Sequence, residues 1–414
     1  MSSWREKLSG YLVWAVCAAY IGLFFDITIS NITLFILLGC CLLILTIPRF
    51  VAAIKSSISV QLLIAFYLLH VVGLLYSENL NYGFFVLEKK ATLLAMPLIF
   101  FPALQYLSKD ERASLLFWLG IITVLSSFVF LGIATFKAVT CHDPLAFHRD
   151  YFASIPYVFY SIYFATGCLL LLYSLYERLS PGNTRVVILL IVIIYSLGLL
   201  VLISSKTGII AYVIALIYFL YIKLRSKRLF FMSMAGVLFS LAMLLVLYPT
   251  TLHRFTELTG NLAVVREDTL KDYQEFNGLN LRLYFWKTSV TQLYADNRLV
   301  AGVGTGDGQD YLDQAYIKRH LDLYGYLGFD PHNQWVITLL QLGLIGVALL
   351  GSVFLFGCRK AYKTNNLAFI FFAWVLFCFS LSESILEANK GVVFFALFFC
   401  VLCAPARNKV TGGG

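Results

Sequence analysis

Apolar runs long enough to cross a bilayer recur along the whole chain. A helix needs about 20 apolar residues to cross roughly 30 Å of hydrocarbon, where no water can satisfy the backbone. Of the 414 residues, 60% are hydrophobic and 13% are charged, which is far more apolar than an ordinary soluble domain. We therefore expect an all-α polytopic membrane protein.

The apolar runs predict about twelve transmembrane helices. The run from Arg185 to Ile222 is too long for one helix, and we divide it at residues 204–208, where polar residues and a glycine interrupt it. No small-residue cleavage site follows the first run, so we expect that run to be retained. The expected spans are residues 10–28, 31–47, 58–76, 83–104, 113–137, 152–176, 185–203, 207–223, 229–248, 333–357, 366–383 and 391–405.

Lysine and arginine concentrate in alternate connections between these spans. Residues 49–55, 109–112, 178–185, 223–228 and 359–363 carry such cations, as do both ends of the chain. The positive-inside rule assigns these segments and both termini to the cytoplasm. The net charge of +9 then reflects topology, and no basic cluster with interleaved aromatic residues indicates a nucleic-acid partner.

This topology leaves one long connection on the outer face. It divides the chain into helices 1–9 in residues 1–248, an outer loop with surface helices in residues 249–331, and helices 10–12 with a cytoplasmic tail in residues 332–414. A transporter built from two related halves would have matching interruptions in both halves, whereas here the polar residues gather in one late loop. We therefore expect a catalytic or binding face on the outer side.

The outer loop contains two expected surface helices with a glycine-rich stretch between them. The first helix, from residue 279, carries Arg282 beside an apolar face. The glycines of residues 302–308 either make a tight turn or point N–H groups at an anion. The second helix carries aspartates at residues 307, 310 and 313, which could bind a metal. Helical acid runs are more often solvated or capping, so we expect no metal.

The sequence FDPHNQW, residues 329–335, joins this loop to the tenth apolar run. Asp330 can cap a helix, and Pro331 suits the first helical position because it has no N–H to lose. We therefore expect His332 in the first turn, where the helix dipole disfavours imidazolium and keeps the ring neutral. The alternative is an interfacial histidine that only caps the helix.

Together these features resemble the O-antigen ligase and polymerase superfamily. The residues that carry the resemblance are Arg282 and Trp286, Gly302-Val303-Gly304, His332-Asn333, and Gly343 with Gly346, and residues 88–101 and 201–213 also look like segments of that family. The resemblance implies a GT-C-type membrane glycosyltransferase with one large helical periplasmic loop between helices 9 and 10. Such an enzyme acts at the periplasmic face of the bacterial inner membrane without a metal, a nucleotide or another cofactor.

The resemblance also implies the substrates. The donor is a glycan on undecaprenyl diphosphate, and the acceptor is a hydroxyl of the lipid A core for a ligase or another lipid-linked repeat unit for a polymerase. We expect the ligase, with membrane lipids as further partners. The alternatives are the polymerase, an oligosaccharyltransferase acting on proteins and, from other classes, a transporter or flippase or a non-catalytic scaffold.

In this interpretation His332 takes the acceptor proton as general base, and Asn333 orients the ring or the acceptor. Arg282 binds the diphosphate and stabilises the leaving group, because its planar fork fits phosphate oxygens. An arginine that only snorkels beside Trp286 is the alternative. We expect direct inverting transfer, while Glu383 stays open as the nucleophile of a retaining reaction.

Lys206 and Ser205 form the second expected phosphate contact. They lie at a helix start, where free N–H groups and hydroxyls favour an anion. Many members of the family carry arginine here, so the lysine is a departure, and a capped turn with a snorkelling lysine is the alternative. Further candidates for substrate contact are Glu88 and Lys89 near the outer end of the fourth span, Arg149 before the sixth, and Glu383, which together with Glu387 could instead pair with Lys390.

Overall fold

In the computed structural model, the described part of the chain comprises residues 3–142, 147, 155–224, 226–256, 265 and 278–404. This part is all-helical, and no strand occurs in it. Seven of its helices are long and apolar enough to cross a membrane, and five shorter apolar helices cover residues 10–22, 58–74, 92–106, 367–380 and 389–403. The chain is a multi-pass membrane protein, as predicted.

Each predicted span overlaps one of these helices. The helices up to the outer loop are α1 (Ser3–Gly22), α2 (Ile27–Ile44), α3 (Ile47–Lys55), α4 (Ile58–Leu74), α5 (Leu80–Lys90), α6 (Thr92–Ala95), α7 (Phe101–Ala103), α8 (Lys109–Thr140), α9 (Tyr157–Arg178), α10 (Asn183–Leu202), α11 (Lys206–Lys223) and α12 (Lys227–Leu247). The remainder are α13 (Pro249–Thr256), α14 (Gly278–Ala295), α15 (Gly308–Ile317), α16 (Gln334–Lys363), α17 (Leu367–Ser380) and α18 (Asn389–Cys403).

The division of the long apolar run at residues 204–208 is confirmed. α10 ends at Leu202 and α11 begins at Lys206. The Ser205 hydroxyl caps α11 by accepting a hydrogen bond from the Gly208 N–H at 3.2 Å. Ser204 has a φ of 56°, which turns the chain between the two helices. Lys206 therefore lies at a helix N-terminus, as expected.

The fourth predicted span is not one continuous helix. α5 ends at Lys90 and is followed by α6, a π turn at Met96–Phe100, α7 and a 3₁₀ turn at Leu104–Tyr106. Pro97 and Pro102 lie in this stretch, where each removes a backbone donor and crowds the preceding turn. The predicted span over residues 83–104 is therefore helical but irregular, and Lys90 ends its first segment.

α16 is kinked at Gly343, which has φ 64° and ψ −163°. The kink frees backbone groups of α16, and these groups form hydrogen bonds with the loop between α14 and α15. The Leu344 N–H donates to the Leu299 carbonyl at 2.8 Å, and the Val303 N–H donates to the Leu340 carbonyl at 2.8 Å. A Cβ on Gly343 would lie within 2.3 Å of the loop backbone, so only glycine permits this contact.

The glycine-rich stretch of this loop forms a packed turn. Each amide N–H from Gly302 to Gly306 donates to a protein acceptor. Since these donors are used internally, the turn interpretation is the one that the structure supports, and an anion would have to displace existing bonds.

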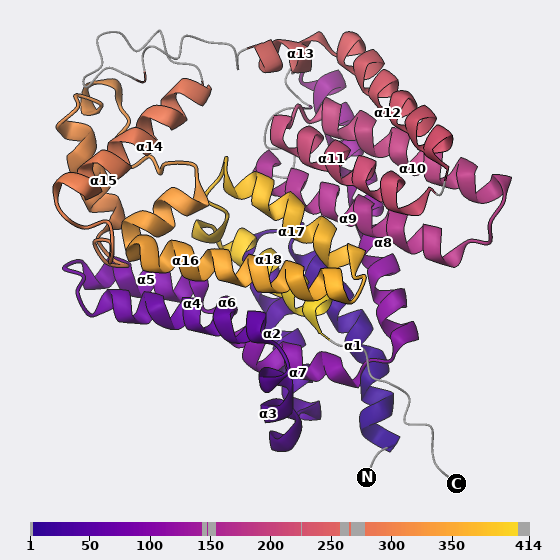
Figure 1. Cartoon of the computed structure of the whole chain (residues 1–414), viewed down its shortest axis with the longest axis horizontal. Helices are drawn as coiled ribbons and strands as arrows, with labels where there is room; N and C mark the ends of the chain where they lie inside the picture. Colours follow the sequence, from indigo (N-terminus) through magenta and orange to yellow (C-terminus); the bar gives the residue numbers. More distant parts are fainter. Residues whose placement is uncertain are drawn as a thin grey trace.

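α14 and α15 lie beside α16 and the turn between α4 and α5, on the left of Figure 1. Tyr284 and Phe285 of α14 share a small core with Leu312 and Tyr316 of α15. Asp307 accepts hydrogen bonds from two N–H groups of the α4–α5 turn, at residues 78 and 79, both at 2.8 Å. The described residues contain no group of three or more His, Cys, Asp or Glu that could hold a metal ion.

Candidate functional site

A cavity of about 270 Å³ lies where the starts of α9, α11 and α14 meet the segment after α17. Lys206 from α11, Arg282 from α14 and Glu383 from the α17–α18 connection all line it. The hydroxyl residues Ser204, Ser205, Thr207 and Ser382 complete its polar side. The fold therefore brings both predicted phosphate-binding cations to one cavity, although they lie far apart in the sequence.

Arg282 projects from the second turn of α14 and pairs with Glu383. One guanidinium nitrogen, Nη2, donates to Glu383 Oε1 at 2.8 Å. A guanidinium has five N–H donors in a fixed fork, so this bond leaves others for phosphate oxygens. Arg282 is therefore both held in place by a carboxylate and able to bind an anion in the cavity.

His332 faces the same carboxylate. Its Nδ1 lies 3.5 Å from Glu383 Oε2 and 3.2 Å from Asp330 Oδ1. Two carboxylates beside Nδ1 favour a proton on that nitrogen, which leaves the Nε2 lone pair to accept a proton. Glu383 therefore joins Arg282 to His332 through its two oxygens.

The environment of His332 raises the pKa of its imidazole above the ordinary value. The largest cause is the hydrogen bond to Glu383; burial opposes it, the charges of Asp330 and Glu383 add to the rise, and the Arg282 guanidinium opposes it. The expectation that a helix N-terminus keeps the ring neutral is therefore wrong in direction. The two carboxylates outweigh any effect of the helix dipole, because they lie closer to the ring.

The start of α16 also differs from the prediction. Asn333 is the N-cap, since its Oδ1 accepts from the Trp335 and Val336 N–H groups at 2.8 and 3.2 Å. His332 thus precedes the helix instead of lying in its first turn, and its φ of 47° is left-handed. Asp330 was the expected cap, but its carboxylate accepts from the His332 N–H at 3.2 Å instead.

Neighbouring bonds fix the position of His332. The Trp286 indole donates to the Pro331 carbonyl at 2.7 Å. The Asn333 N–H donates to the Ser384 hydroxyl, and its side-chain amide donates to the Leu381 carbonyl, both at 3.2 Å. Asn333 therefore holds the backbone that follows the histidine to the α17–α18 connection, where we had expected it to orient the ring or the acceptor.

Lys206 and Ser205 occupy the expected helix start. Ser205 uses its hydroxyl to cap α11, and the neighbouring Thr207 hydroxyl lies 3.0 Å from the Ser382 hydroxyl. These contacts bring the start of α11 against the α17–α18 connection. Lys206 therefore lines the cavity from the start of α11.

Glu88 and Lys89 do not line this cavity. Glu88 is exposed. The Lys89 ammonium donates to the Glu387 carbonyl at 3.0 Å and lies 5.0 Å from the centre of the Phe85 ring. Their predicted contact with substrate stays a prediction. Arg149 lies outside the described residues.

A second charged cluster surrounds Lys90 and was not predicted. The Lys90 ammonium is buried and lies 2.6 Å from Glu387 Oε1, 2.9 Å from Gln341 Oε1 and 3.0 Å from His70 Nε2. Lys390 donates to the Phe25 carbonyl, and the carboxylate of Glu387, its suggested partner, pairs with Lys90. Polar residues inside the apolar runs, at positions 70 and 341, were the available signal for this cluster.

Comparison with known proteins assigns the domain that contains most of the site. Residues 190–351 match a family model described as O-antigen ligase. This segment includes Lys206, Arg282, His332 and Asn333, whereas Glu383 lies beyond it. A search of curated proteins finds no match. Over residues 190–351, which hold both predicted cations and the predicted base, the chain is similar to the O-antigen ligase family.

Proposed function

We propose that the protein is an O-antigen ligase that transfers a glycan from undecaprenyl diphosphate to a hydroxyl of the lipid A core. The observation that carries this proposal is the chain of contacts from Arg282 through Glu383 to His332 beside a cavity that Lys206 also lines. It joins a site for an anionic leaving group to a base for the acceptor. A metal-independent transfer needs both.

The reaction is an inverting displacement at the anomeric carbon. As the acceptor oxygen attacks, His332 Nε2 takes its proton, and the bond from the sugar to the diphosphate breaks. A positioned base of this kind contributes on the order of 10² to 10⁴ in rate. Arg282 and Lys206 stabilise the charge that develops on the departing undecaprenyl diphosphate.

Glu383 serves as the group that orients His332. One of its oxygens accepts from Arg282 and the other faces the imidazole, so the carboxylate is engaged on both sides. A retaining reaction would need a carboxylate directed at the anomeric carbon. The two contacts of Glu383 favour the inverting course.

The proposal includes the membrane arrangement. The enzyme has about twelve spans in a GT-C-type architecture, with both termini in the cytoplasm of a bacterium and the cavity at the periplasmic face of the inner membrane. Residues 1–248 form nine spans, residues 249–331 the periplasmic loop, and residues 332–414 the last three spans and the tail. The bilayer holds the polyprenyl tail of the donor.

Glycan transfer by purified protein tests the proposal. The protein is placed in nanodiscs with an undecaprenyl-diphosphate-linked glycan, with EDTA throughout, and with the lipid A core supplied or omitted. His332→Ala is compared with His320→Ala, because His320 is an exposed histidine of the same outer segment that also has a left-handed φ, 61°. Product that requires the lipid A core, persists in His320→Ala and disappears in His332→Ala supports the ligase.

Two other results would redirect the proposal. Longer lipid-linked glycans formed without the lipid A core would identify a polymerase, which uses the same donor. Donor binding without transfer by a folded protein, unaffected by His332→Ala, would favour a transporter or flippase.

A further inference from the structure

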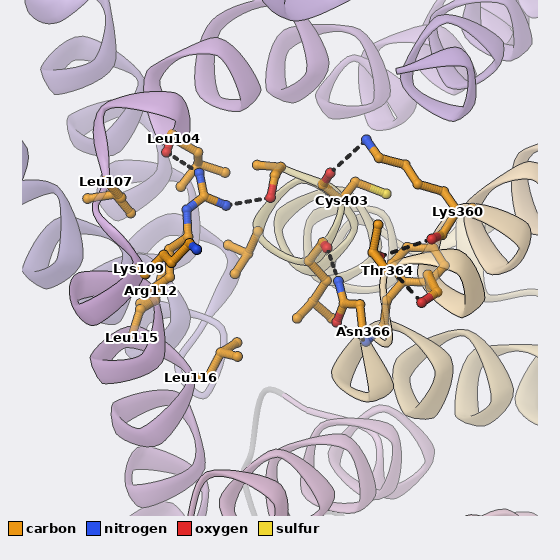
Figure 2. A pocket seen from close by; sticks show the side chains of 16 residues that line it. Leu104, Leu107, Lys109, Arg112, Leu115, Leu116, Lys360, Thr364, Asn366 and Cys403 are labelled. Atoms are coloured by element: carbon orange, nitrogen blue, oxygen red, sulfur yellow. Dashed lines mark hydrogen bonds between the residues drawn. The ribbon is translucent and has the colours of Figure 1, made fainter. Parts of the chain in front are cut away.

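A larger cavity, of about 510 Å³, lies near the opposite end of α16 from His332. The start of α8, the end of α16, the start of α17 and the end of α18 form its walls. In Figure 2, Lys109 and Arg112 of α8 lie on one side and Lys360, Thr364 and Asn366 on the other. It is therefore separate from the candidate transfer site.

The lining of this cavity is amphipathic. Leu107, Leu115, Leu116, Phe369 and Leu402 supply apolar surface. The three cations Lys109, Arg112 and Lys360 flank it, and none of its 16 lining residues is acidic. Asp110 and Glu111 follow Lys109 on α8, but Glu111 is engaged in capping that helix with Ser108. An apolar slot with a cationic rim fits a ligand with apolar chains and an anionic head.

Part of this charge has a local structural use. Arg112 donates to the carbonyls of Leu104 and Ala404, and Lys360 donates to the Cys403 carbonyl at 3.3 Å. These carbonyls include the end of α18, where the helix dipole favours cations. Each cation has more N–H donors than these contacts use, and Lys109 makes no hydrogen bond or ion pair to a described residue. The positive charge around the cavity thus exceeds what is needed to bind the free carbonyls at the C-terminus of α18.

We propose that this cavity binds one anionic phospholipid, with its acyl chains against the leucines and its headgroup phosphate between Lys109 and Lys360. Lys109 and Lys360 lie in two of the cation-rich connections that we assign to the cytoplasm, where the leaflet is rich in anionic lipid. Basic pockets between transmembrane helices on that side are a recognised form of anionic lipid site. Lysine side chains at helix ends also extend readily to headgroup level.

Lipid binding by delipidated protein in detergent tests this assignment. Native mass spectrometry and thermal unfolding compare phosphatidylglycerol with phosphatidylethanolamine of the same acyl chains. The double variant Lys109→Gln/Lys360→Gln is matched by Lys227→Gln/Lys363→Gln, which removes two exposed lysines outside the cavity on the same predicted side. We expect phosphatidylglycerol to bind at least roughly tenfold more weakly to the cavity variant and unchanged to the control, since one phosphate contact to a charged group contributes about 1.5–3 kcal/mol.

Three results would overturn the proposal. They are equal binding of the two lipids by the parent protein, equal loss in the cavity and control variants, and equal stabilisation by inorganic phosphate, which would show that the anion alone suffices. If the double variant unfolds without lipid, the single variant Lys109→Gln is used for the binding comparison, because it removes no hydrogen bond or ion pair to a described residue.

Discussion

Glu383 and Glu387 lie on the same connection between α17 and α18, and each pairs with a cation from another helix. Glu387 pairs with Lys90, whose side chain is 1% exposed. Three acceptors surround the Lys90 ammonium, which matches its three donors. His70 completes this cluster, because its Nδ1 lies 2.9 Å from the Phe66 carbonyl while its Nε2 faces Lys90. The Lys90 ammonium therefore has no donor left for a substrate.

The pair around Glu383 is open by comparison. The Arg282 side chain is 30% exposed and that of His332 is 36% exposed. A cavity adjoins the pair, and the guanidinium keeps donors for an anion. Two neighbouring glutamates thus serve different purposes. The saturated cluster fixes the connection in place, and the open cluster is where we propose that a substrate binds.

Lys90→Met should have the largest effect. It leaves the partly buried Glu387 carboxylate without its cation, and breaking a fully buried ion pair costs about 3–5 kcal/mol, an upper limit here. We expect a large fall in the thermal unfolding midpoint, with part of it recovered in Lys90→Met/Glu387→Leu. Lys89→Met is the control, because Lys89 bonds only to a backbone carbonyl. Unchanged unfolding with lost transfer would mean that the saturated cluster takes part in the chemistry.

Arg282→Ala should reduce transfer by roughly 10² to 10³, the usual loss when one group that stabilises developing charge is removed. Because the pair it breaks is partly exposed, we expect little change in the unfolding midpoint. Arg298→Ala, at an exposed arginine of the same outer segment, should keep its activity. Initial rates at saturating donor measure the difference, and a similar loss in both variants would contradict the assignment.

Glu383→Gln should move the pH dependence of transfer. The hydrogen bond to Glu383 raises the pKa of His332, so the base stays protonated to a higher pH than an ordinary histidine. Removing the carboxylate lowers that pKa, and the acidic limb of the rate profile should shift to lower pH. The maximal rate should fall by about tenfold as the orientation of the ring is lost. If the acidic limb of the rate profile does not shift, His332 is not the base whose titration produces that limb.

Lys206→Arg should have the smallest effect. A planar guanidinium can bind phosphate oxygens through two bonds, whereas an ammonium is a point charge. We expect donor affinity to increase roughly fivefold, or about 1 kcal/mol, and Lys206→Ala to weaken it. The KM for the donor reports both changes. If the KM for the donor is the same in both variants as in the parent protein, the open cluster binds the diphosphate without Lys206.

The sequence predicted those features that depend on local pattern. Apolar length located the helices, and the polar interruption at Ser204–Gly208 located a real break, because hydrocarbon excludes unsatisfied backbone. The break after Lys90 was missed, since the apolar run continues through Pro97 and Pro102. The helix start at Asn333 was misassigned because Asp330 and Asn333 are both good caps, and only the fold decides between them.

The contacts that connect the residues of the site could not be predicted from the sequence. Arg282, Lys206 and His332 were each proposed from local context and the family resemblance. The link between Arg282 and His332 through Glu383, and the place of Lys206 in the same cavity, depend on how the α17–α18 connection packs against α14 and α11. Gln341 and His70 could have been recognised as polar residues in apolar helices, but their common partner Lys90 follows from tertiary packing alone.

The shortness of α17 and α18 determines how deep this site lies. They have 14 and 15 residues, so each is roughly 21–23 Å long, against about 30 Å of hydrocarbon. Both are largely buried in the protein, so the bilayer does not have to thin around them. α17 starts beside the end of α16, so in the proposed topology the connection that carries Glu383 lies below the outer membrane surface. The proposed acceptor sugar would then have to reach down to it, into a medium whose dielectric constant is lower than that of water and where opposite charges attract more strongly.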